Sequence, residues 1–168
     1  MPVTLIATAG DANANSYSTL AEATAYHDTH LYGSAWTNAD PDDQARALIW
    51  ATRILDAEVN WVGSKYTADQ ALRWPRSSVL DRDGYTVAVD AIPTFLKQAT
   101  AELARWLLTE DRTAERGYGI TRLKADVVEL EFDKSDERPM LPEAVLSLIA
   151  GYGDAGAQIS GVVKLVRV

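Results

Sequence analysis

The chain contains no cysteine among its 168 residues. Disulfide bonds, thiolate zinc sites and cysteine nucleophiles are therefore excluded. It also contains no apolar run close to the roughly 18 residues that cross a bilayer. Its first stretch, MPVTLIATAGDANANS, lacks the positive flank and the long apolar segment of a signal peptide. We expect neither secretion nor a membrane anchor.

Basic side chains are scarce. Sixteen lysines and arginines face 24 acidic residues, for a net charge of −8. Residues 61–109, with six basic and five acidic side chains, are the only weakly basic segment. Nucleic-acid binders usually carry a basic face, because the release of counterions from phosphates drives much of their affinity. The composition therefore argues against general DNA affinity.

Catalytic and metal-binding motifs are also missing. The two histidines, His27 and His30, are three residues apart but lack an HExxH pattern. Asp40, Asp42 and Asp43 suit the start of a helix better than a cation site. No GxxxxGK[ST] or GxSxG pattern is present. We expect no enzyme, no cofactor and no bound metal.

Three segments have helical patterns. Residues 19–33 begin with a capping box of Thr19 and Glu22 and contain Leu20, His27 and Leu31 at helical spacing. Residues 40–59 begin with Asp40 as the cap and Pro41 in the first turn, and residues 92–111 begin near Pro93. The second segment has a predicted buried stripe of Ala45, Leu48, Ile49, Thr52, Leu55 and Val59. The third has one of Leu96, Ala99 or Thr100, Leu103 and Trp106 or Leu107.

The two ends of the chain have strand-like patterns. Residues 3–9 predict a strand or arm, and residues 126–133 alternate apolar and acidic side chains as a half-buried strand does. A short helix is expected near 141–151, a flexible stretch near 153–161 and a last strand over 162–168.

The predicted fold class is mainly α: a small helical bundle, a long loop between the second and third helices, and extended, partly β terminal segments. We expect one domain over 1–168, with a helical core at about 15–111 and a β-rich C-terminal arm at about 120–168.

The long loop contains LRWPRSSVLDRDG at 72–84. Trp74 and Pro75 are predicted to anchor this loop to the core. Core packing is also expected for Trp50, Trp61 and Trp106, whereas Trp36 is expected to lie in a loop. Its arginines can pair with carboxylates of the loop itself or of a neighbouring subunit. The candidate subunit-interface residues are Arg73, Trp74, Arg76, Asp81, Arg82 and Asp83.

Four stretches resemble a family of tailed-phage head–tail adaptors, also called connector or head-completion proteins. They are NSYSTLAEATAYH (15–27), AWTNADPDDQARALIWATRILD (35–56), QALRWPRSSVLDRDG (70–84) and IPTFLKQATAELARWLL (92–108). Some members of that family carry the label of a DnaT-like ssDNA-binding protein.

The resemblance implies a structural protein of the virion neck, present in the host cytoplasm before assembly. Copies would form a ring, of dodecameric size, beneath the portal protein, and would dock the tail or a stopper. DNA would pass through an acidic channel without specific binding. The candidate arm contacts are Val162, Val163, Leu165 and Val166, which could join a partner's sheet edge. The alternatives are an ssDNA-binding replication protein and, third, an enzyme.

Overall fold

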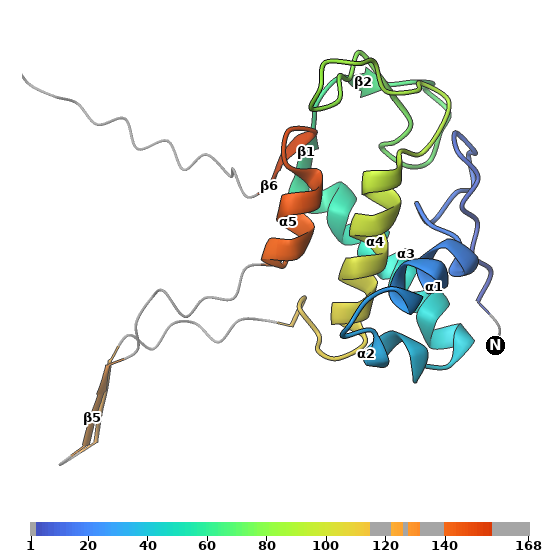
Figure 1. Ribbon diagram of the computed structural model, residues 1–168. Helices are drawn as coiled ribbons and strands as arrows, with labels where there is room; N and C mark the ends of the chain where they lie inside the picture. The colour runs from blue at the N-terminus through green and yellow to red at the C-terminus, as the bar shows by residue number, and fades with distance from the viewer. Residues whose placement is uncertain (1–2, 115–121, 126–127, 132–139, 156–168) are drawn as a thin grey trace, which may run out of the picture.

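Helices form the body of the chain, and short strand pairs join its segments (Figure 1). The computed structural model describes residues 3–114, 122–125, 128–131 and 140–155. Its helices are α1 (Leu20–Asp28), α2 (Ser34–Thr37), α3 (Pro41–Glu58), α4 (Thr94–Leu107) and α5 (Glu143–Ile149). Its strands are β1 (Val59–Trp61), β2 (Ser64–Lys65), β3 (Arg76–Ser77), β4 (Arg122–Ala125), β5 (Val128–Glu131) and β6 (Gly153–Ala155).

The core lies between α3 and α4, with α5 against the other side of α4. The predicted stripes are confirmed at Leu48 and Leu55 of α3 and at Leu96 and Leu103 of α4, which are fully buried, whereas Trp106 and Leu107 at the end of the α4 stripe are half-buried. Ile49 is only half-buried, so it lies at the edge of its stripe. Burial of large aliphatic side chains at the helical period is what holds the two helices together.

The start of α3 is placed as predicted, with Pro41 at its first position, but Asp40 makes no capping hydrogen bond through its side chain. Asp42 and Asp43 lie in the first turn, where the helix dipole favours negative charge. Both carboxylates also contact the guanidinium of Arg46, at 3.8 and 2.5 Å. The acidic cluster is therefore part of a helix terminus.

Helix α1 begins with the predicted capping box. The Thr19 hydroxyl accepts from Glu22 N–H at 3.2 Å, and the Glu22 carboxylate accepts from Thr19 N–H at 2.9 Å. The helix ends at Asp28 rather than at Gly33, because turns with His30 N–H donating to His27 and Gly33 N–H donating to His30 follow it. Leu31, which was predicted at a helical position, lies beyond the helix and is 86% exposed.

Trp36 is not a loop residue. It lies in α2 and is completely buried, and its indole N–H donates to the Thr24 hydroxyl at 3.2 Å. The short α2 turn thus fills the space beside α1 with the largest side chain available.

The N-terminal segment 3–9 forms no strand, which corrects the β prediction. Its backbone is held instead by Asn15: Ile6 N–H donates to the Asn15 side-chain oxygen at 2.8 Å, and Asn15 N–H donates to the Ile6 carbonyl at 2.9 Å. Leu5 and Ala9 pack against the core. The segment is therefore extended and lies on the body, and no strand of the described residues pairs with it.

The long connection between α3 and α4 contains three of the strands. β2 pairs with β3 in antiparallel fashion, and β1 pairs with β6 near the other end of the chain. The expectation of a flexible stretch is thus wrong at Gly153–Ala155. A Cβ at Gly63 would lie 2.2 Å from the Ser77 carbonyl oxygen, so only glycine allows this connection to fold back so closely.

Beyond α4, strands β4 and β5 pair with each other in register from Arg122 with Glu131 to Ala125 with Val128. The strand predicted at 126–133 is confirmed over 128–131, and the short helix is confirmed as α5, with Pro142 at its N-cap position. Val162, Val163, Leu165 and Val166 lie outside the described residues. The class is α-helical with small two-stranded sheets, rather than the mainly helical bundle that was expected.

In the segments that the structure describes, no helix is both long and apolar enough to span a membrane.

Candidate interaction surface

Trp74 anchors the long connection, as predicted. Its side chain is 1% exposed, and its ring meets the edges of Trp61 at 5.8 Å and Phe95 at 5.7 Å between centroids. The main-chain N–H of Trp74 donates to the Tyr17 hydroxyl at 3.3 Å. Pro75 is buried beside it. The side chain of this candidate interface residue is therefore used inside the chain.

Arg76 is also an internal residue, with 9% of its surface exposed. Its guanidinium donates to four main-chain carbonyl oxygens, those of Trp61, Val62, Gly63 and Arg73, at 2.5–3.3 Å. The predicted carboxylate partners are wrong for this side chain. Burial lowers the pKa of Arg76 from its ordinary value, which is already far above neutral pH.

Arg82 takes carbonyl partners too. It donates to the Ser147 oxygen at 2.7 Å and to the Ala150 oxygen at 3.2 and 3.3 Å, at the C-terminal end of α5. A cation at this end of a helix meets unpaired carbonyls and the negative end of the dipole. The predicted pairing of Arg82 with Asp81 or Asp83 is wrong in the described part of the chain. Arg82 therefore ties the connection to α5.

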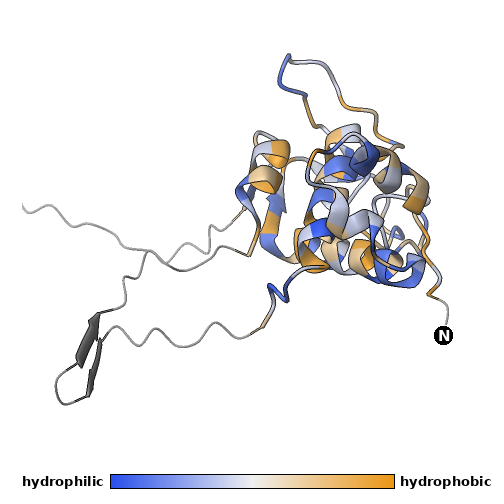
Figure 2. Cartoon of the chain, turned by 60° about the horizontal axis from the view of Figure 1, so that its bottom comes forward, coloured by the Kyte–Doolittle hydropathy of each residue, from blue (hydrophilic) through white to orange (hydrophobic). Residues whose placement is uncertain are grey.

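The residues around Arg82 form a projecting loop, which we call the tip loop (residues 80–86). Asp81 shapes it by accepting from Asp83 N–H at 3.0 Å and Tyr85 N–H at 2.8 Å, and Gly84 supplies the positive φ of 87°. This turn at 81–84 was predicted. Leu80 and Tyr85 are 57% and 74% exposed. Figure 2 shows the tip loop reaching beyond the helices, with hydrophilic residues at its end.

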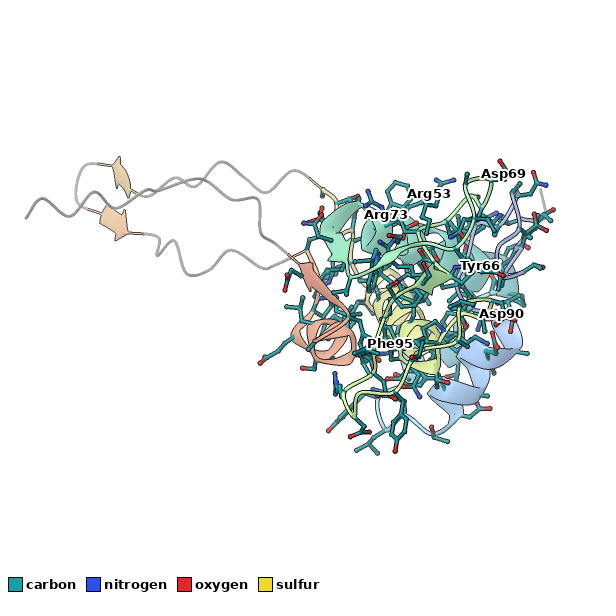
Figure 3. The ribbon with its side chains drawn as sticks, turned by 90° about the horizontal axis from the view of Figure 1, so that it is seen from above. Arg53, Tyr66, Asp69, Arg73, Asp90 and Phe95 are labelled. Carbon is teal, nitrogen blue, oxygen red and sulfur yellow. The ribbon has the colours of Figure 1, made fainter. Side chains whose placement is uncertain are left out.

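A second surface, which we call the α3 face, consists of Trp50, Arg53 and Arg73. Trp50 is 41% exposed, so its predicted place in the core is wrong, and the Arg53 guanidinium lies over its ring at 5.6 Å. Arg73 N–H donates to the Asp56 carboxylate at 3.1 Å, which brings this arginine beside the same turns of α3. Figure 3 shows Arg53 and Arg73 on one side of the body and Phe95 toward the other side.

Most cations of the helical body are engaged within the chain. Besides Arg46, Arg76 and Arg82, these are Lys65 with the Gln70 carbonyl at 2.8 Å, Lys97 with Glu22 at 2.6 Å, Arg105 with Glu102, and Arg112 with Glu110 at 2.7 Å. Between residues 3 and 114, the side chains of Arg53 and Arg73 make neither a hydrogen bond nor an ion pair. Among residues 3–114, the α3 face therefore holds the cations that are available to a partner.

The two histidines belong to a buried cluster around Glu102. His27 is buried and its Nε2 lies 3.0 Å from the Ala101 carbonyl oxygen, while His30 Nε2 lies 3.5 Å from the Glu102 carboxylate. Burial lowers the pKa of His27, which favours the neutral ring. In the segments with defined structure, no three His, Asp or Glu side chains are grouped as metal ligands would be.

One family model matches the whole chain, residues 1–168, and its description is "Putative DnaT-like ssDNA binding protein". The chain belongs to this DnaT-like family. No curated protein and no solved structure matches it.

For this member of the DnaT-like family, the sequence predicted the tip loop as part of an interaction surface but did not predict the α3 face. A signal for the α3 face was present, because Trp50 and Arg53 are three apart and fall outside the buried stripe of α3. Arg73, Asp81, Arg82 and Asp83 of the predicted interface lie near the molecular surface, whereas Trp74 and Arg76 lie in the interior. The structure thus divides the predicted set between an anchor and an exposed surface.

Proposed function

We propose that this chain is a structural subunit of the neck of a tailed phage, a head–tail adaptor. In this proposal, copies form a ring beneath the portal protein, extend the DNA channel and dock the tail or a stopper. The chain acts in the virion and is present in the host cytoplasm before assembly. DNA passes through the ring without specific binding, and no catalytic group is needed.

The use of cations inside the chain is the observation that carries this proposal. A phosphate-binding surface needs several lysines or arginines that are available together. Here the described cations mostly contact carboxylates or main-chain carbonyls of their own chain, and the net charge is −8. Such a surface repels phosphate, which suits a channel through which DNA slides.

The exposed apolar side chains support a role in protein contacts. Leu31, Tyr32, Leu80 and Tyr85 are 57–86% exposed, and all four lie in connections between elements. Large apolar side chains on projecting loops are typical of surfaces that another protein covers.

The test is the composition of particles made by the phage that encodes this chain. We expect the chain in purified virions by mass spectrometry, at a stoichiometry close to that of the portal. We also expect DNA-filled heads without tails when its reading frame is deleted. Absence of the chain from virions would refute the proposal.

A second candidate function, ssDNA binding, follows from the family description and from one local feature. Arg53 over the half-exposed Trp50, with Arg73 nearby, combines cations with an aromatic face, as base-stacking surfaces do. Between residues 3 and 114 only these two arginines are free, and the whole chain has a net charge of −8, so we expect no measurable ssDNA binding near physiological salt.

Fluorescence anisotropy with a labelled oligonucleotide tests this second candidate. Micromolar, salt-sensitive binding that Arg53→Glu with Arg73→Glu abolishes would favour it over the adaptor. The matched control is Arg46→Glu, which also reverses one charge on α3 but removes an arginine already paired with Asp42 and Asp43.

A further inference from the structure

The tip loop and the α3 face have opposite character and lie in different parts of the molecule. Arg82 directs its charge toward the carbonyls at the end of α5, and the Asp81 carboxylate accepts from main-chain N–H groups of the loop, which leaves Asp83 as the exposed carboxylate of the tip loop. The α3 face carries Arg53 and Arg73, which have no acceptor within the helical body. Acidic and basic patches of this kind are complementary.

The apolar parts of the two surfaces match as well. Leu80 and Tyr85 flank the acidic residues of the tip loop, and Trp50 lies beside Arg53 on the α3 face. Tryptophan, tyrosine and arginine are the side chains most often found at the energetic centre of protein interfaces. The α3 face thus combines an aromatic ring with cations, and the tip loop combines an aromatic ring with negative charge.

We infer that the tip loop of one copy docks on the α3 face of a second copy, with Asp83 next to Arg53 and Arg73 and with Tyr85 against Trp50. The contact deepens the proposed adaptor function, on which it rests, because it names the surfaces that join ring neighbours. The two patches differ and lie on different sides of the body (Figure 3), so the contact runs head to tail. Contacts of that kind repeat from copy to copy and close into a ring or continue as a filament.

Chemical cross-linking tests the contact directly, because the chain has no cysteine of its own. One variant carries Thr86→Cys at the exposed base of the tip loop, and a second, affinity-tagged variant carries Ala57→Cys on the exposed side of α3, one turn from Arg53. The two are mixed and treated with a short bis-maleimide. The matched control replaces Ala57→Cys with Ala25→Cys, an exposed alanine on α1.

The tagged heterodimer should form several-fold more from Thr86→Cys with Ala57→Cys than from Thr86→Cys with Ala25→Cys. A chain carrying both Thr86→Cys and Ala57→Cys should give a ladder of oligomers, as a head-to-tail contact requires. Equal yields from the two pairs, or a dominant homodimer of Thr86→Cys, would overturn the inference.

Charge reversal shows whether the proposed pairing produces the cross-link. Asp83→Arg alone and Arg53→Glu alone should each lower the yield by about tenfold, because each places like charges together. The chain with both changes keeps the net charge of −8 and should recover the yield. Failure of this recovery, with folded proteins by circular dichroism, would also overturn the pairing.

The contact and the adaptor function can fail separately. Virions that contain the chain, together with equal cross-linking yields, would refute this contact alone. A specific cross-link from a chain that is absent from virions would refute the adaptor function alone. Loss of oligonucleotide binding in Arg53→Glu, without a cross-link in the wild-type background, would assign the α3 face to ssDNA and overturn the contact.

Discussion

Arg76 shows how one side chain can hold a long connection in place. A guanidinium has five donors in a fixed plane, and here it donates to four carbonyls, three of them just before β2 and one just before β3. These carbonyls lie at the turn after β1 and beside Trp74. Without Arg76, several of them would be buried without a donor.

Replacing Arg76 should therefore cost stability rather than assembly. We expect Arg76→Ala to lower the free energy of unfolding by about 2–3 kcal/mol, because buried carbonyls lose a charged donor. Arg73→Ala, which removes an exposed side chain three residues away, should change it by less than about 0.5 kcal/mol. Urea denaturation measures both. Equal effects would mean that the carbonyl contacts contribute little.

Glu102 should make stability depend on pH. Burial by itself raises the pKa of Glu102, but the hydrogen bond from Arg105 and the charge of Arg105 outweigh it, so the pKa is lowered. A lowered carboxyl pKa stabilises the fold above the unfolded-state value, and this contribution is lost as the pH falls through the folded-state pKa.

Glu102→Gln should consequently be less stable than wild type by about 1–3 kcal/mol at neutral pH. The difference should shrink as the pH is lowered from about 5 toward 3, near and below the ordinary glutamate value. Asp56, whose pKa burial raises, has the opposite dependence and is common to both proteins. Glu58→Gln, at an exposed carboxylate, is the control. A difference that stays constant with pH would contradict the role of the Glu102 charge.

At the scale of elements, α3 and α4 bury their apolar stripes against each other. Truncating a side chain in either stripe should therefore lower the free energy of unfolding. We expect Leu55→Ala and Leu103→Ala each to lower the free energy of unfolding by about 2–5 kcal/mol, because both side chains are fully buried. Leu31→Ala, at a leucine that is 86% exposed, should cost less than about 0.5 kcal/mol. Chemical denaturation of the three variants is the measurement, and comparable losses would contradict the packing described.

The same two helices show what a sequence can predict. The structure confirms three local patterns: the apolar period of α3 and α4, Pro41 at the start of α3, and the capping box of the neighbouring helix α1. The failures involve partners that are distant in sequence: β6 pairs with β1, Asn15 holds residues 3–9, and Trp36 fills space beside α1. No local period encodes such pairings.

The candidate interface shows the same division. The Trp74 anchor and the 81–84 turn were predictable, since an aromatic residue before proline and an Asp-Gly pair have strong local preferences. The acceptors of Arg76 and Arg82 were not, because they are main-chain carbonyls that every residue possesses. Which carbonyl is left free is decided by the fold.

At the scale of the whole molecule, β6 is the last element that the structure describes, and residues 162–168 are predicted to serve assembly. Deleting 162–168 should leave the free energy of unfolding within about 0.5 kcal/mol, because α5 and β6 make the described contacts with the body. It should weaken incorporation into particles. Circular dichroism and gel analysis of purified particles report the two effects.

Two outcomes of that deletion would contradict the assembly role. If the shortened chain unfolds, residues 162–168 belong to the folded body. If it folds and enters particles at the normal level, these residues are dispensable, and the tip loop becomes the main candidate for the contact.

The β1–β6 pairing also sets the order in which a newly made copy becomes complete. A ribosome delivers Val59 and Trp61 about ninety residues before it delivers Gly153 and Ala155, so the nascent chain carries an unpaired strand edge while the intervening segment is made. Only a chain that has been made as far as Ala155 can close that edge. A chain terminated before Gly153 would keep this edge open and be exposed to proteases, so truncated products would be removed.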